Sequence, residues 1–200
     1  MNLPPVALKL DVRLLAGHQR VADIVHFLTG HPCYDLARAS NLVALTGWLI
    51  LLLLYVPLGV LVGRGAGPFA NTVLCVAALV MAVGMLRLAR RTDGRLRMMH
   101  RAWLSSWICR GLPMVPRPGV TAETPEARLL NLGIAVCMAL TCGVAMSNAQ
   151  FDAVTILGLT GTILMGAGVP ATAYFEACRP RPPGRSRPKV ARPEGVTTRA

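Results

Sequence analysis

The sequence predicts an all-α polytopic membrane protein with four transmembrane helices and both termini in the cytosol. Two observations carry this prediction. Four nearly uncharged apolar stretches are each long enough to cross a bilayer, and the 21 Lys and Arg residues fall almost entirely outside them. A spanning helix needs about 20 apolar residues, because the hydrocarbon core is about 30 Å thick and a helix rises about 1.5 Å per residue. The predicted spans are 41–63, 69–89, 129–146 and 153–175.

These spans are predicted as helices because lipid offers no hydrogen-bond partner to the backbone. Each amide of a lone spanning segment must then be paired within that segment, as in a helix. Barrel strands would appear as segments of about ten residues with alternating hydrophobicity, and no such segments occur. Pro57 and Pro170 lie near span ends, where proline kinks a membrane helix without ending it.

The orientation follows from the distribution of basic residues. Four Lys and Arg residues precede residue 41, nine lie between Arg87 and Arg128, and seven lie from Arg179 onward. The two remaining loops carry only Arg64 between them. Because positive residues stay on the cytoplasmic side, we expect the termini and the middle segment to face the cytosol. Arginine outnumbers lysine, which is typical of a GC-rich genome and favours a bacterial inner membrane.

The N-terminal segment, residues 1–40, is predicted to be cytosolic, with an amphipathic helix over 5–29 that ends before Gly30 and Pro32. We expect no cleavable signal peptide, because charged side chains interrupt the first 25 residues. A helix of this kind lies on the membrane surface, or docks a cytosolic partner. Its apolar face comprises Val6, Leu10, Leu14, Val21, Ile24, Val25 and Leu28.

The middle segment, residues 90–128, is predicted as a basic cytosolic loop with an interfacial helix over 96–112. Trp103 and Trp107 share one face of that helix, and tryptophan prefers the boundary between lipid and water. Arginines beside them would contact acidic headgroups of the inner leaflet. The C-terminal segment, residues 178–200, is rich in proline and arginine and is predicted to be disordered.

The spans give little sign of catalytic or metal chemistry. No His, Lys, Arg, Asp or Glu lies in the middle of any span, so we expect no enzyme activity, no cofactor and no metal site. The cysteines at 75, 137 and 142 could bind a soft metal, but residues five apart on a helix point about 140° away from each other. We therefore favour a packing role for them. His26, His31 and Cys33 match no usual zinc spacing.

Two stripes of small residues predict close helix packing in the second half of the chain. Small residues at four-residue spacing let helix backbones approach, and hydroxyl groups add hydrogen bonds between helices. We favour packing of the third and fourth spans on each other, with self-association through one stripe as the alternative. The stripes are Gly133, Cys137 and Thr141 in the third span, and Gly158, Thr162 and Gly166 in the fourth.

The functional hypothesis is a non-enzymatic scaffold or accessory subunit of a larger inner-membrane assembly. Its expected partners are the lipid bilayer, acidic lipid headgroups, and other membrane proteins or a second copy of the chain. Nucleic acid is not an expected partner, because the orientation bias accounts for most of the net charge of +12. The alternative is a small transporter or channel for a soft metal or small solute. Its path would be lined by Asn71, Thr72, Cys75, Thr141 and Cys142.

Overall fold

In this computed structural model the described residues, 4–61, 67–110, 124–147 and 152–182, form an all-helical fold with no strand among them. The side chains of residues 70, 110 and 141–147 lie outside the description. In chain order the elements are α1 (Pro5–Thr29), α2 (Cys33–Leu49), η1 (Ile50–Tyr55), α3 (Val56–Leu61), α4 (Pro68–Arg110), α5 (Pro125–Ser147) and α6 (Ala153–Ala177).

Helix α1 begins and ends at residues suited to those positions. Pro5 occupies the first turn, where its missing N–H would have no intrahelical acceptor. Gly30 follows the helix with a φ of 76°, and its amide bonds to the carbonyl of His26 at 2.8 Å. This left-handed conformation favours glycine, because a Cβ would crowd the following carbonyl. The predicted helix over 5–29 is therefore confirmed.

Elements α2, η1 and α3 form one continuous rod from Cys33 to Leu61. In η1 the helix widens to π geometry, and the amide of Val56 bonds to the carbonyl of Leu51, five residues back. The next residue, Pro57, has no amide hydrogen to give to the carbonyl four residues earlier. The change of register at η1 accommodates that loss.

Helix α4 runs without a break for 43 residues, from Pro68 to Arg110, which is about 65 Å at 1.5 Å per residue. The sequence predicted a span ending at residue 89 and a separate interfacial helix over 96–112, whereas the structure joins the two. No proline interrupts the chain between Pro68 and Pro113. We call the part of α4 beyond the predicted span, residues 90–110, the α4 extension. Leu96 and Trp103 are buried against other parts of the protein, so one face of this extension packs on the protein itself.

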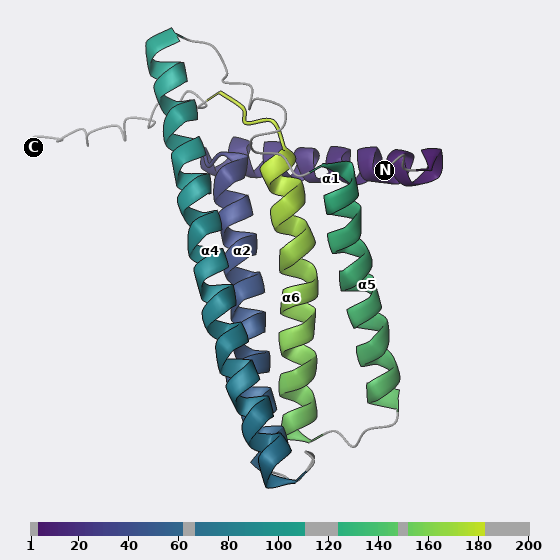
Figure 1. The fold of residues 1–200 in the computed structure, drawn as a ribbon. Coiled ribbons are helices and arrows are strands. Elements are labelled where there is room, and N and C mark those ends of the chain that lie inside the picture. Colours follow the sequence, from purple (N-terminus) through teal and green to yellow (C-terminus); the bar gives the residue numbers. More distant parts are fainter. Residues whose placement is uncertain (1–3, 62–66, 111–123, 148–151, 183–200) are drawn as a thin grey trace, which may run out of the picture.

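The four long rods lie in the order α4, α2, α6, α5, and α1 crosses one end of them almost at right angles (Figure 1). Helix α4 packs on α2, α2 on α6, and α6 on α5, while α1 contacts α6, α5 and α2. We call the end that α1 crosses the α1 end. Helix α4 extends beyond the other rods at this end (Figure 1).

Helices α2 and α6 make the closest backbone approach. A Cβ placed on Gly168 would lie 2.5 Å from the backbone nitrogen of Ala44. One placed on Gly47 would lie 2.6 Å from both the Gly161 carbonyl oxygen and the Met165 nitrogen. These distances leave no room for a side chain, so glycine is required at this crossing.

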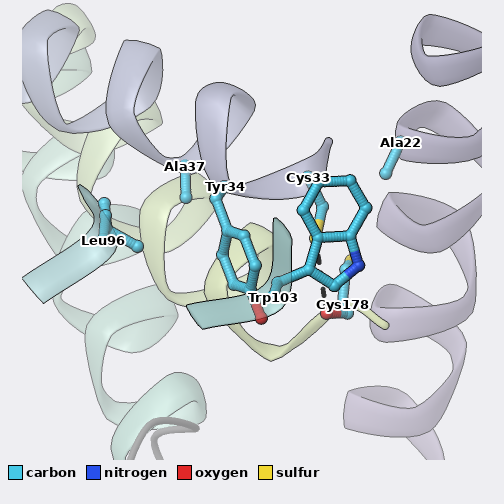
Figure 2. Close-up of a cluster of buried hydrophobic side chains, with 7 residues drawn as sticks. All are labelled: Ala22, Cys33, Tyr34, Ala37, Leu96, Trp103 and Cys178. Atoms are coloured by element: carbon cyan, nitrogen blue, oxygen red, sulfur yellow. Dashed lines mark hydrogen bonds between the residues drawn. The ribbon is translucent and has the colours of Figure 1, made fainter. Parts of the chain in front are cut away.

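The buried apolar cluster lies at the α1 end (Figure 2). Helices α1, α2 and α4 and the residue after α6 all contribute to it, so it joins segments that are far apart in the sequence. We call it the α1-end cluster. Its members are Ala22, Cys33, Tyr34, Ala37, Leu96, Trp103 and Cys178.

Three helical segments are long and apolar enough to cross a membrane: Cys33–Leu61, Asn71–Cys109 and Ala153–Ala177. They contain all of the predicted span 153–175 and most of the predicted spans 41–63 and 69–89, and this is compatible with an integral membrane protein. The remaining predicted span, 129–146, lies within helix α5, whose last seven side chains are not described.

Candidate functional site

A buried ion pair joins three helices at the α1 end. Asp11 of α1 accepts hydrogen bonds from Nε and Nη2 of Arg128 at 3.0 and 2.6 Å. It also accepts one from the Tyr174 hydroxyl of α6 at 3.1 Å. The Asp11 and Arg128 side chains are 2% and 7% exposed. A charge pair tolerates such burial only when hydrogen bonds complete it, and here each of three helices supplies one partner. The contact therefore fixes how α1 lies on the bundle.

A second buried carboxylate belongs to Glu176, near the end of α6. Its side chain is 1% exposed, and its Oε2 accepts a hydrogen bond from Nη2 of Arg95 at 2.8 Å. This pair borders a cavity of about 280 Å³ that residues of α2, α4, α5 and α6 line. Leu45 and Trp48 are among its apolar lining residues, and Asn131 adds an amide. The cavity is therefore lined by both charged and apolar side chains.

The residues that follow α6 form a C-terminal strap, residues 178–182, which lies along α1. The Arg179 amide donates to Oε1 of Gln19 at 2.8 Å, and Nε2 of Gln19 donates back to the Arg179 carbonyl at 3.1 Å. Nε2 of His26 lies 2.7 Å from the carbonyl oxygen of Pro182. The sequence predicted disorder over residues 178–200. Residues 183–200 lie outside the described residues, while 178–182 are held by this pairing.

An ion pair holds the middle of the strap. Nε and Nη2 of Arg181 each bond to an oxygen of Asp23 at 2.8 Å. The hydrogen bond from Arg181 lowers the pKa of Asp23 below its ordinary value, with smaller help from Gln19. The same bond raises the pKa of Arg181. Both groups reach solvent, so the pair orders the strap more than it stabilises the fold.

Two cysteines meet where the strap begins. The thiol of Cys33 lies 3.5 Å from the carbonyl oxygen of Cys178, and the Cys178 thiol bonds to the carbonyl of Tyr174 at 3.3 Å. Burial raises the pKa of Cys178 to about 12. This thiol therefore stays protonated near neutral pH, and a protonated thiol is a poor nucleophile and a poor metal ligand.

The predicted small-residue stripe of α6 divides between two neighbours. A Cβ on Gly158 would lie 2.6 Å from the ring of Tyr55, so this glycine packs on η1. Thr162 is buried, and its hydroxyl bonds to the Gly158 carbonyl at 2.8 Å. A Cβ on Gly166 would lie 3.8 Å from the carbonyl oxygen of Ala135 in α5, an ordinary contact distance.

The matching stripe of α5 is more open. In the described part of the chain, a Cβ on Gly133 would meet no atom of a neighbouring element within 4 Å. Gly133, Cys137 and Thr162 line an open groove of about 560 Å³ between α5 and α6. The side chain of Thr141 lies outside the described residues. A packing role for this stripe stays a prediction.

The two tryptophans predicted as interfacial anchors lie near the free end of α4. Trp103 is 2% exposed and belongs to the α1-end cluster (Figure 2). Trp107 is partly buried and packs against that cluster. Neither indole nitrogen has a hydrogen-bond partner among the described residues. Anchoring of these side chains in lipid stays a prediction.

The residues of the alternative transport path are divided between two helices. Asn71, Thr72 and Cys75 lie on α4, which packs on α2, whereas Thr141 and Cys142 lie on α5, which packs on α6. The last two side chains are outside the description. Among the described residues, no group of three or more His, Cys, Asp or Glu side chains is placed to hold a metal ion.

Sequence reasoning missed the contact of Asp11, Arg128 and Tyr174. Two signals were present. Asp11 lies one helical turn from the apolar residues Ala7, Leu14 and Leu15, and Arg128 is the last charged residue before a long apolar stretch. A single acid and a single base in such settings need partners when they are buried, but 117 positions separate the two residues.

No family model, curated protein or solved structure matches this chain.

Proposed function

We propose that the protein is a small, non-enzymatic subunit of a bacterial inner membrane, with four spans and both termini in the cytosol. In this proposal it acts as a scaffold or accessory component of a larger membrane assembly. The fourth span is α5, and the α1 end faces the cytosol, where the positive-inside rule puts the basic segments. The bilayer and its acidic headgroups are then the first partners of the arginines near the start of the extension of α4.

The observation that carries this proposal is the set of non-covalent contacts that joins distant segments at the α1 end. Three segments distant in sequence are fixed there: α1 by the Asp11–Arg128 pair, the C-terminal strap by Asp23, and the extension of α4 by the α1-end cluster. A docking surface needs side chains that are held in place before the partner arrives, because ordering them on binding costs free energy.

The outward face of the α4 extension is the surface proposed for docking. Met98 and Ile108 are exposed there although both are apolar, being 66% and 76% exposed. Exposed Arg91 and Arg101 lie on the same side of the helix as Met98, by helical spacing. An apolar surface bordered by arginines is typical of protein interfaces.

The test is purification of the full-length protein in mild detergent, with its partners identified and their ratio to the protein measured. A scaffold retains a partner in a fixed ratio, and Met98→Asp or Ile108→Asp should release it. Arg20→Gln on the solvent side of α1 is the matched control, since it changes the charge by the same amount. Retention of the partner by both α4 variants would reject this docking surface. Recovery of the protein alone, after crosslinking in intact cells, would reject the scaffold.

The second candidate, a transporter or channel for a small solute, is favoured by the cavity beside Glu176 and Arg95. Its buried ion pair could exchange a partner for a polar solute. Flux of small solutes into vesicles that contain the purified protein tests this role. Flux that is lost in Glu176→Gln and kept in Glu126→Gln would replace the scaffold with a transporter.

A further inference from the structure

A second pocket lies between α2 and α4 near the α1 end, and it is rich in arginine. Its volume is about 260 Å³, slightly below the roughly 300–1,000 Å³ of pockets for drug-sized ligands. A compact group therefore fits it better than a large molecule. Its lining residues are Tyr34, Asp35 and Arg38 of α2, and Leu96, Arg97, His100, Arg101 and Leu104 of α4.

Two of the three arginines are held by one carboxylate outside the lining. Asp93 accepts a hydrogen bond from Nε of Arg38 through one oxygen and from Nη2 of Arg97 through the other. Each guanidinium carries five N–H donors, so these bonds leave the terminal nitrogens of Arg38 available. Asp93 thus positions two guanidinium groups at the pocket and occupies only part of their donor capacity.

The third arginine of the lining is Arg101. Arg101 makes no ion pair with any residue that the structure describes, and its side chain is exposed at the pocket. The lining carboxylate, Asp35, lies 3.4 Å from Nδ1 of His100 and 2.9 Å from Nδ1 of His31. With both histidines neutral, three arginines face two carboxylates, so the pocket keeps a net positive charge.

The lining of the pocket also includes Tyr34, which carries a hydroxyl group. Tyr34 is 3% exposed, and its ring points from α2 toward the part of α4 that carries Trp103 (Figure 2). The Tyr34 hydroxyl makes no hydrogen bond within the described part of the chain, although it lines the pocket. A hydroxyl that opens on the pocket can donate a hydrogen bond to a ligand oxygen there.

We propose that this pocket binds a phosphate group. Guanidinium groups match phosphate in shape, since two parallel N–H donors meet two oxygens. Basic pockets between membrane helices near the bilayer surface bind lipid headgroups for the same reason. In this arrangement Arg38 and Arg101 contact the phosphate oxygens, Arg97 adds charge, and Tyr34 donates a hydrogen bond. Arg101 also borders the docking surface proposed above, but phosphate binding in the pocket does not require a docked protein partner.

The phosphate could belong to a lipid headgroup or to free inorganic phosphate, and the test separates the two. Full-length protein in a neutral detergent is titrated by calorimetry with dihexanoylphosphatidic acid, with inorganic phosphate, and with dihexanoylphosphatidylcholine. Saturable binding of the phosphatidic acid alone assigns the site to a lipid headgroup. Saturable binding of inorganic phosphate as well assigns it to phosphate from either source. Equal binding of all three probes, or none, overturns the proposal.

The variants tie binding to the pocket. Arg101→Gln removes a charge that takes no part in the described ion pairs, so the fold should persist, and affinity should fall roughly tenfold. Tyr34→Phe keeps the ring and should weaken binding several-fold. Arg20→Gln on α1 is the matched control and should bind as the native protein does. Unchanged affinity in Arg101→Gln, with the fold intact by thermal unfolding, overturns the proposal.

Discussion

Asp11 and Arg128 are 117 positions apart in the chain, yet the Asp11 carboxylate accepts hydrogen bonds from both Nε and Nη2 of Arg128. This two-bond contact, with Tyr174 as a third partner, locks α1 across the end of the bundle. An ion pair so buried stabilises little against a well-packed apolar alternative, but the loss of one partner leaves an uncompensated charge inside the protein.

Asp11→Asn or Arg128→Gln should therefore destabilise the protein by about 3–5 kcal/mol. Tyr174→Phe removes one neutral donor and should cost about 1 kcal/mol. Thermal unfolding in detergent measures all three against Arg13→Gln, an exposed control on the same helix. Equal melting temperatures for Asp11→Asn and the control would show that the pair does not hold α1 on the bundle.

Alanine should have opposite effects on stability at two glycines, one inside the α2–α6 crossing and one outside it on α5. Gly168→Ala would push a methyl group into the backbone at Ala44, so the two helices must separate and unfolding should occur at a markedly lower temperature. Gly133→Ala meets open space and should leave stability unchanged or raise it by up to about 1 kcal/mol. Similar melting temperatures for the two variants would contradict the crossing.

These glycines show what the sequence could and could not predict. Hydropathy and helix-end residues predicted helices over 5–29, 41–63, 69–89, 129–146 and 153–175, because each signal is local. The stripe at Gly158, Thr162 and Gly166 was visible as a set of small residues, but its neighbours were not. Helical spacing describes one helix, whereas the choice between η1, α2 and α5 as partner depends on the whole bundle.

The candidate site was less predictable than the fold. Asp11, Asp93 and Glu176 each pair with an arginine of another element, and no spacing rule relates such pairs. Only the additional pair of Asp93 with Arg97 follows the four-residue spacing of a helix. The length of α4 had a clearer local cause, since no proline interrupts it. The sequence suggested that Trp103 and Trp107 contact lipid, whereas protein buries Trp103. An apolar helix face has the same sequence pattern whether lipid or protein covers it.

Attachment of the C-terminal strap should depend on pH. The folded pKa of Asp23 lies below its ordinary value of 3.8 because Arg181 bonds to the charged form. The stabilisation that the Asp23–Arg181 pair gives to the attached strap is therefore fully present above that ordinary value. It is lost as the pH falls through the folded pKa. Hydrogen exchange at the Arg179 amide, corrected for its intrinsic rate, should speed up over that range.

The control for the strap is Asp23→Asn, which removes the charge at every pH. In this variant the Arg179 amide should already exchange faster at neutral pH, and the remaining dependence on acid should vanish. Equal protection in the variant and the native protein at neutral pH would mean that the Gln19 pairing alone holds the strap.

Trp103 should be shielded from lipid by the α1-end cluster. In a protein with Trp48 and Trp107 changed to Phe, lipids brominated along their acyl chains should leave its fluorescence nearly unquenched. Trp103→Ala should also cost about 3–5 kcal/mol of stability, as for other large buried aromatic residues. Strong quenching of Trp103 would instead support the interfacial anchor predicted from the sequence.

The central claim is a membrane protein with four spans whose α1 end faces the cytosol. Labelling of single cysteines, on a background without native cysteines, by a reagent that cannot cross the bilayer tests it most directly. Cysteines at Gly65 and Asn148 should react from outside intact cells, and cysteines at Lys9 and Ser105 should react only after the membrane is opened. Labelling of Lys9 or Ser105 from outside, or of Asn148 only from within, would contradict the account.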